Sequence, residues 1–333
     1  MNRTDSITSV ALVILWSSGF IGADLGTGEA SAQTLLSWRF VVAAVILIAW
    51  CRYRGLRPTW QGFRRHAVIG FCCQFLYLGF LFVGVGLGVP SGTAALIAAM
   101  QPLVVAALSS RVLGEHFGSG RVLSLAFGLV GVVLVVAGDL GGAGRVPWIA
   151  YMLPLAGMLA LSAGTVLERR VNTTEPIALA MAMQASVSAA LFTTWSVIAG
   201  DAAPPADGRF WSAVEWLVIL STFGSYGVYM FVSRRSGATR ASTLLYLTPA
   251  TTMVWAWAMF GDSITLVAVA GLVITLASVC EWKSIARYVF PLTYGVRPPS
   301  RPTARKSRSS AATPEPPHPS PVGSYPRASN DGD

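Results

Sequence analysis

The chain has 333 residues, of which 53% are apolar and 12% charged, and its formal net charge is +9. A soluble domain has about a quarter of its residues charged, so this composition excludes an ordinary soluble domain. The apolar residues fall in runs of roughly 17 to 23, the length that a helix needs to cross about 30 Å of hydrocarbon.

These runs predict an all-α integral membrane protein with ten transmembrane helices. In chain order the predicted spans are 6–24, 34–50, 67–87, 92–110, 121–138, 148–167, 177–199, 213–233, 241–260 and 265–281. Glycine, proline and charged residues separate them, as is typical of loops.

The basic residues orient these spans. If the N-terminus is cytoplasmic, 21 Lys and Arg residues lie on the cytoplasmic side and only Arg145 and Arg209 on the other. This asymmetry predicts that both termini are cytoplasmic, and it attributes the positive charge to topology rather than to a nucleic-acid partner. Residues 283–333, rich in Pro, Ser and Arg, are predicted to be a disordered cytoplasmic tail that is either solvated or lies on anionic lipid.

The two halves of the chain resemble each other. Pro102 precedes Gly114-Glu115, and Pro249 precedes Gly261-Asp262 at the same spacing of 13 residues to the acid, so the copies are offset by 147. We expect each Gly-acid pair to form a turn in which the acid caps the next helix. The predicted repeats are residues 1–140 and 146–282, each with five helices. Because five is odd, the two repeats must be inverted relative to each other in the membrane.

Three segments together resemble a known family. They are Trp16-Ser-Ser-Gly-Phe-Ile-Gly22, Leu36-Ser-Trp-Arg39-Phe, and the paired segments that run from proline to Gly-Glu or Gly-Asp. Over residues 7–282 the chain resembles the EamA family of the drug/metabolite transporter superfamily. The resemblance implies a bacterial inner-membrane exporter or importer of amino acids, related metabolites or drugs. The second copy has Leu161 where the first has Trp16, and Asp262 where the first has Glu115, so roles of the first-copy residues are not expected to be duplicated.

The titratable residues are predicted to avoid the membrane interior. His66, His116 and His318 are assigned to loops or the tail, and Glu168, Glu215 and Glu281 to helix ends. This pattern predicts no catalytic residues, no metal site and no cofactor. It also favours facilitated exchange over coupling through a proton-binding residue.

Arg39 is the one full charge assigned to the interior of a span, about 7 to 8 Å deep at 1.5 Å per residue. It either binds a substrate carboxylate or helix-end carbonyl in a central cavity, or snorkels to the interface or makes a structural hydrogen bond. Pro102 and Pro249 are predicted inside helices, as hinges that expose a carbonyl or as static kinks.

Uncharged polar and aromatic residues could line the same cavity. For the hydroxyl groups the alternative is a hydrogen bond to their own helix. The candidates, besides Arg39, are Trp16, Ser17, Ser18, Gln74, Tyr77, Gln101, Ser162, Thr165, Gln184, Tyr226 and Tyr246. Trp38, Trp148, Trp195, Trp211 and Trp216 lie near span ends and are interpreted as interfacial anchors.

The predicted function is secondary transport, as an exporter of small metabolites such as amino acids or drug-like molecules, by alternating access around the central cavity. The alternatives are a membrane sensor that binds without transport, and a lipid flippase or scramblase of the same fold. The expected partners are a small-molecule substrate and the lipid bilayer, with the chain a monomer or homodimer.

Overall fold

The computed structural model describes residues 3–112, 119–140, 146–171, 175–236 and 244–289, which all belong to one compact unit, and within these residues the secondary structure is helical. The elements of the first half are α1 (Arg3–Thr27), α2 (Ala32–Tyr53), α3 (Trp60–Gly70), η1 (Phe71–Leu76), α4 (Tyr77–Gly86), α5 (Ser91–Ala98), α6 (Gln101–Val112) and α7 (Ser119–Leu140). Those of the second half are η2 (Trp148–Tyr151), α8 (Met152–Val171), α9 (Ile177–Ala199), α10 (Gly208–Trp216), η3 (Leu217–Gly224), α11 (Ser225–Ser236), η4 (Leu245–Leu247), α13 (Thr248–Phe260) and α14 (Leu266–Val289).

Every predicted span overlaps a helical segment of this structure. By length and apolar composition, six segments of the described chain can cross a membrane: Ser6–Thr27, Ala32–Tyr53, Trp60–Gly86, Ser91–Val112, Trp148–Val171 and Ile177–Ala199. Ala126–Leu140 and Leu266–Ala277 are apolar but shorter. The helix α14 ends at Val289, beyond the predicted end at 281, and residues 290–333 of the predicted tail lie outside the described residues.

Large apolar side chains on the outer faces of the helices confirm a membrane setting. Val45 on α2 is 61% exposed, Val133 on α7 57% and Val273 on α14 57%. A soluble protein rarely exposes contiguous apolar surface of this kind, whereas lipid solvates it without cost. Inside, aromatic rings fill the core: the rings of Phe40 and Phe192 stack with their centroids 5.7 Å apart.

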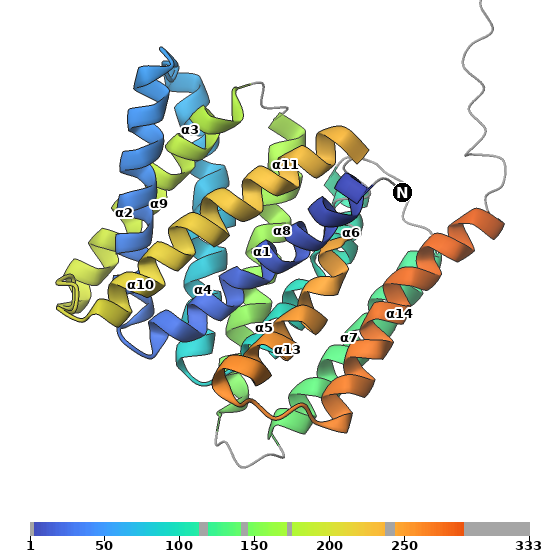
Figure 1. The fold of residues 1–333 in the computed structure, drawn as a ribbon. Coiled ribbons are helices and arrows are strands. Elements are labelled where there is room, and N and C mark those ends of the chain that lie inside the picture. The colour runs from blue at the N-terminus through green and yellow to red at the C-terminus, as the bar shows by residue number, and fades with distance from the viewer. Residues whose placement is uncertain (1–2, 113–118, 141–145, 172–174, 237–243, 290–333) are drawn as a thin grey trace, which may run out of the picture. The chain divides into compact units, whose positions relative to one another are not determined.

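Two helix pairs dominate the packing, as Figure 1 shows: α2 lies along α9, and α7 lies along α14. In the first pair the Ser37 and Thr193 hydroxyls are 2.8 Å apart, and the Thr34 hydroxyl donates to the carbonyl of Asp201 at 2.6 Å. Thr34 thus contacts Asp201, just after α9, whereas the later residue Ser37 contacts the earlier residue Thr193. The two helices are therefore antiparallel.

The α7–α14 pair is also antiparallel and unusually close. A Cβ atom on Gly131 would lie 2.7 Å from the carbonyl oxygen of Gly271, and one on Gly271 would lie 2.6 Å from that of Gly131. Only glycine permits this approach, as in other tightly packed membrane helices. Four residues beyond Gly271, the Thr275 hydroxyl donates across to the Gly128 carbonyl at 3.5 Å.

Two predicted spans are irregular in a matched way. The span 67–87 contains the π-helical stretch η1, and the span 213–233 contains the π-helical stretch η3. A π-helical turn inserts an extra residue and rotates the side chains that follow, and such turns are frequent at functional sites. Neither was predicted from the apolar pattern.

The two prolines were predicted to lie inside helices, but each lies in the first turn of one. Pro102 is the second residue of α6, after a break at Ala99 and Met100, and Pro249 is the second residue of α13, which follows η4. Proline is tolerated in the first helical turn because the N–H groups there have no intrahelical partner. Each proline therefore begins a helix segment after a discontinuity.

Of the two Gly-acid pairs, only Gly261-Asp262 lies within the described residues. Gly261 has φ of 75° and caps the C-terminus of α13, as the turn prediction requires. Asp262, however, does not cap α14: the Thr265 hydroxyl accepts from the Ala268 N–H at 3.1 Å. Gly114 and Glu115 lie outside the described residues.

Candidate functional site

Arg39 lies on α2 and is 5% exposed, so it does not snorkel to the interface. Its Nε and Nη2 donate to the Thr222 hydroxyl at 3.3 and 3.2 Å, and Nη2 also donates to the Ser221 hydroxyl at 3.2 Å. The guanidinium carbon lies 5.3 Å from the ring centre of Phe40 and 5.9 Å from that of Phe82. Hydroxyl groups and aromatic faces thus surround this cation.

The π-helical stretch η3 supplies both hydroxyls. The Thr222 hydroxyl also donates to the Leu217 carbonyl, five residues earlier, at 3.0 Å. The Nη1 atom of Arg39 is buried without a hydrogen-bond partner, and the ion pairs of the described residues do not include Arg39. A buried guanidinium normally pairs with an anion, so this group retains a free donor and an unbalanced charge. Tyr77 lies close enough to interact with it electrostatically.

A second polar group joins the two predicted glutamines to a histidine. His66 was assigned to a loop, but it lies on α3 and is fully buried. The helix starts early because the Thr59 hydroxyl caps it, accepting from the Gly62 N–H at 3.1 Å, although Arg64, Arg65 and His66 interrupt the apolar run. The assignment of His66 to a loop is therefore wrong.

The hydrogen bonds of this second group have one consistent direction. Ser188 donates to Gln74 Oε1 at 3.2 Å, and Gln74 Nε2 donates to Gln184 Oε1 at 3.1 Å. Gln184 Nε2 lies 3.1 Å from His66 Nδ1, and His66 Nε2 lies 3.4 Å from a carboxylate oxygen of Glu175. An amide N–H can only donate, so Nδ1 accepts and a neutral imidazole carries its proton on Nε2. This series of hydrogen bonds links α3 and η1 to α9.

The other predicted residues make local or pairwise contacts. Gln101 Nε2 donates to the Thr165 hydroxyl at 3.2 Å, which links α6 to α8. Thr165 and Ser162 each donate to a carbonyl of their own helix, at 2.8 Å in both cases. These two hydroxyls follow the structural alternative, while Gln101 is the group that reaches a second helix.

The α1 candidates also bond within the protein. The Ser17 hydroxyl donates to the Thr248 carbonyl at 3.4 Å, and the Ser18 hydroxyl donates to the Leu15 carbonyl at 2.6 Å. Trp216 was interpreted as an interfacial anchor, but its Nε1 donates to the Ser18 carbonyl at 2.9 Å, inside the bundle.

Two of the aromatic candidates, Trp16 and Tyr226, lie near the same tyrosine. The Trp16 ring centre is 5.7 Å from that of Tyr229, and the Tyr226 ring centre is 6.5 Å from that of Tyr229. Tyr246 lies on η4 and is half-buried. Trp16 and Tyr226 are therefore joined through a tyrosine that was not among the candidates.

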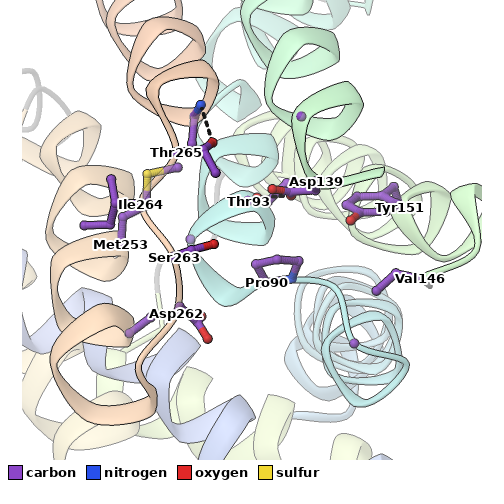
Figure 2. Close-up of a pocket in the computed structure, with 15 residues that line it drawn as sticks. Pro90, Thr93, Asp139, Val146, Tyr151, Met253, Asp262, Ser263, Ile264 and Thr265 are labelled. Carbon is purple, nitrogen blue, oxygen red and sulfur yellow. Dashed lines mark hydrogen bonds between the residues drawn. The ribbon is translucent and has the colours of Figure 1, made fainter. Parts of the chain in front are cut away.

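A pocket of about 300 Å³ lies at the end of the bundle where α7 and α13 finish and α5 begins. Figure 2 shows Asp139 and Thr93 on one side of it and the segment Asp262–Thr265 on the other. The Thr93 hydroxyl donates to Asp139 at 2.7 Å. Asp262, in the loop after α13, interacts electrostatically with Asp139 and with Asp24 at the end of α1. Burial raises the pKa of the Asp262 carboxyl.

These acids were missed because each ends or directly follows an apolar run, where the sequence predicts a helix end or a turn. A signal was present: Asp24, Asp139 and Asp262 all fall at span ends that the charge asymmetry predicts to be non-cytoplasmic. The sequence does not reveal that they converge, since this depends on how three distant helices end.

Both halves of the sequence match a known protein family. The sequence profile of the EamA-like transporter family matches residues 6–137 and again 148–280. The chain belongs to the EamA-like transporter family. The resemblance inferred from the short segments is thereby confirmed, and the protein is a multi-pass membrane protein of a transporter family.

Individual relatives agree with this family. The chain is 26% identical over 294 residues to the uncharacterized inner membrane transporter YedA of Escherichia coli, covering 86% of this chain and 93% of YedA. It is 24% identical over 291 residues to the uncharacterized transporter YdfC of Bacillus subtilis, covering 82% and 89%. A crystal structure that is 20% identical superposes with a TM-score of 0.63, covering 87% of this chain and 99% of the other, which shows a shared fold.

Proposed function

We propose that this protein is a secondary transporter that exports small metabolites, such as amino acids or drug-like molecules, across a bacterial inner membrane. In this proposal ten helices cross the membrane as two inverted five-helix repeats, residues 1–140 and 146–282, with both termini in the cytoplasm. Transport proceeds by alternating access, in which the two repeats exchange conformations around a central cavity.

The observation that carries the proposal is the antiparallel pairing of matched helices. The helix α2 is the second of the first family match and α9 holds the same place in the second, while α7 and α14 are the last of each. Both pairs run antiparallel, as expected for helices that are related by a pseudo-twofold axis in the membrane plane. Thr275 and Gly128, which are hydrogen-bonded, are separated by 147 residues, the offset between the repeats.

The paired π-helical stretches give independent support. The stretches η1 and η3 begin 146 residues apart, at Phe71 and Leu217, in corresponding helices of the two family matches. Each places polar groups inside the bundle: Gln74 on η1, and Ser221 and Thr222 on η3. The same irregularity in both halves supports a cavity bordered by equivalent segments.

Arg39 supports a substrate that carries a carboxylate. Its buried Nη1 donor has no partner, and a guanidinium binds a carboxylate through two parallel hydrogen bonds. We therefore assign Arg39 the role of the anion-binding residue of the central cavity, with Tyr77, Trp16 and Tyr226 as the aromatic wall. Gln74, Gln101 and Gln184 supply amides, and the segment breaks before Pro102 and Pro249 serve as hinges.

Buried His66 changes the expectation for energy coupling. Facilitated exchange was favoured because no acid or histidine that could bind a proton is predicted in the middle of a span, whereas His66 is buried on a helical segment, Trp60–Gly86, that can cross a membrane. A transport assay must therefore be run with and without a proton gradient.

The test is counterflow in proteoliposomes preloaded with pooled amino acids and related metabolites. We expect a labelled solute to enter the vesicles when the preloaded pool contains the same solute in unlabelled form. Protein-free vesicles should take up none. Solute that binds to the protein but never crosses would contradict transport and favour a sensor. Movement of fluorescent lipid without solute flux would favour a flippase or scramblase.

A further inference from the structure

The pocket between α5, α7 and α13 has the size and walls of a small-molecule site. Its volume of about 300 Å³ is at the lower end of the range for ligand pockets. Met253, Ala256, Ala268 and Val146 make apolar walls, and two carboxylates interrupt them. Both halves of the chain contribute: Thr93 lies in the first family match, Asp139 two residues after its end, and Asp262 in the second match.

The charge of this pocket is negative. Asp139 and Asp262 line it, and Asp24 lies close enough to Asp262 to interact with it. The lining residues include no lysine or arginine in the described part of the chain, and Arg145, which precedes Val146, lies outside that part. Neighbouring like charges in a partly desolvated site repel one another unless a cation lies between them.

The positions of the acids are not explained by helix stability. Asp24 lies in the last turn of α1 and Asp139 in the last turn of α7. The negative end of the helix dipole disfavours a carboxylate at a helix C-terminus. Among the described residues, the Thr93 hydroxyl, in the first turn of α5, donates to Asp139 in compensation.

Tyr151 provides an independent indication that a ligand binds in this pocket. It is 1% exposed, and its hydroxyl has no hydrogen-bond partner. It lines the pocket, and Figure 2 shows its hydroxyl directed toward the space beside Pro90 and Asp139. A buried hydroxyl without a partner is costly, so an N–H group in the pocket would relieve this cost.

The residue types distinguish between classes of cation. The described residues contain no group of three acidic, histidine or cysteine side chains that could hold a metal ion. Two separated carboxylates, a tyrosine hydroxyl and apolar walls instead suit an ammonium group attached to an apolar body. We propose that this pocket binds small organic cations through Asp139 and Asp262, with the Tyr151 hydroxyl accepting from the ammonium group.

The test is equilibrium binding to the full-length protein in detergent, measured by titration calorimetry with three probes of one shape. These are benzylammonium, neutral benzyl alcohol and anionic benzoate. We expect only benzylammonium to bind. Because this measurement involves no flux, it is independent of the proposed transport, and either proposal could fail without the other.

Three variants decide which residues bind the probe. D139N/D262N should weaken benzylammonium binding by more than about tenfold, because both charge-assisted hydrogen bonds are lost. Y151F should weaken it by about three- to tenfold and keep the packing of the ring. E29Q removes one negative charge from the loop at the same end of the bundle without touching the pocket, and should bind like the wild type.

Several outcomes would overturn the proposal. They are equal binding of benzylammonium and benzyl alcohol, wild-type affinity in both D139N/D262N and Y151F, and an equal loss in E29Q. Gel filtration and the melting temperature identify a variant that fails to fold. If D139N/D262N does so, the conservative Y151F variant alone decides, and wild-type affinity in it counts against the site.

Discussion

At the scale of single residues, the structure shows a buried cation and partly buried acids, which need partners of opposite charge. Arg39 is a cation with hydroxyl and aromatic neighbours, and Asp139 and Asp262 are acids around a pocket. A buried charge is costly unless it is paired, so each of these groups either weakens the fold or is balanced by a bound partner. Substitutions can separate these two effects.

Replacing Arg39 with alanine should abolish counterflow while leaving a folded protein. If the substrate carboxylate is bound by the guanidinium, losing this bond costs about 1.5–3 kcal/mol, or roughly ten- to hundredfold in affinity. R39K keeps the charge without the planar fork, so its activity should be intermediate. The measurement is the counterflow rate per folded molecule.

The matched control alters the hydroxyls that hold Arg39. In S221A/T222V the guanidinium loses its three hydrogen bonds, so the melting temperature should fall more than in R39A. Wild-type counterflow in R39A would show that Arg39 has a structural role alone.

Replacing Asp262 with asparagine should stabilise the protein, and more so at high pH. Burial raises the pKa of Asp262 in the folded state above its unfolded value. The folded state therefore binds the proton more tightly, so stability is greatest below the unfolded pKa and falls as pH rises through the folded pKa. Asparagine has no such dependence.

This effect is measured as the difference in melting temperature between D262N and wild type. The difference should be near zero at about pH 3.5, close to the unfolded pKa, and positive at pH 8. Because Asp262 is only partly buried, we expect less than about 1 kcal/mol. E29Q is the control, since the ion pair of Glu29 with the exposed Arg209 side chain is long, at 3.9 Å. A constant difference across this pH range would show that ionisation of the Asp262 carboxyl does not destabilise the fold.

At the scale of elements, the sequence predicts where the helices lie but not how they deviate from regularity. Apolar runs place the spans because hydrocarbon demands them. They do not reveal that α3 starts at Trp60, which depends on the Thr59 cap and brings His66 into the bundle. They also do not reveal η1 or η3, because one inserted residue changes the facing of side chains without changing hydropathy.

The α7–α14 contact provides a test at this scale. G131V should destabilise the protein by about 1–3 kcal/mol or more, because the new side chain meets the backbone of α14, which cannot move aside as a flexible side chain would. In contrast, a Cβ atom on Gly227 would have no neighbour within 4 Å, so G227A should be neutral or gain about 0.5–1 kcal/mol. Melting temperatures in detergent compare the two, and equal stability would contradict close packing of α7 on α14.

At the scale of the whole molecule, the duplication is visible in the sequence but the contacts between the copies are not. The spacing from proline to acid predicts two copies, and the family matches agree. The convergence of Asp139 with Asp262 depends on how the copies pack, and local sequence has no signal for it. The candidate residues were chosen for their polarity, so they include Ser162 and Thr165, whose hydroxyls bond to their own helix.

The inverted arrangement makes a prediction about sidedness. Because α2 and α9 are antiparallel, the segments that follow them leave this pair at opposite ends. Pro58 lies in the segment after α2 and Ala206 in the segment after α9, and both are exposed. A protein whose four native cysteines are replaced by alanine can carry a single new cysteine at either position.

In right-side-out vesicles, a membrane-impermeant maleimide should label A206C and leave P58C unlabelled until the membrane is opened. The physical reason is the charge asymmetry: five arginines lie between residues 52 and 65, whereas Arg209 is the one basic residue between 200 and 210. Labelling of P58C alone would reverse the orientation but keep the two segments on opposite sides. Labelling of both without opening the membrane would place them on one side, which two antiparallel membrane-spanning helices do not allow.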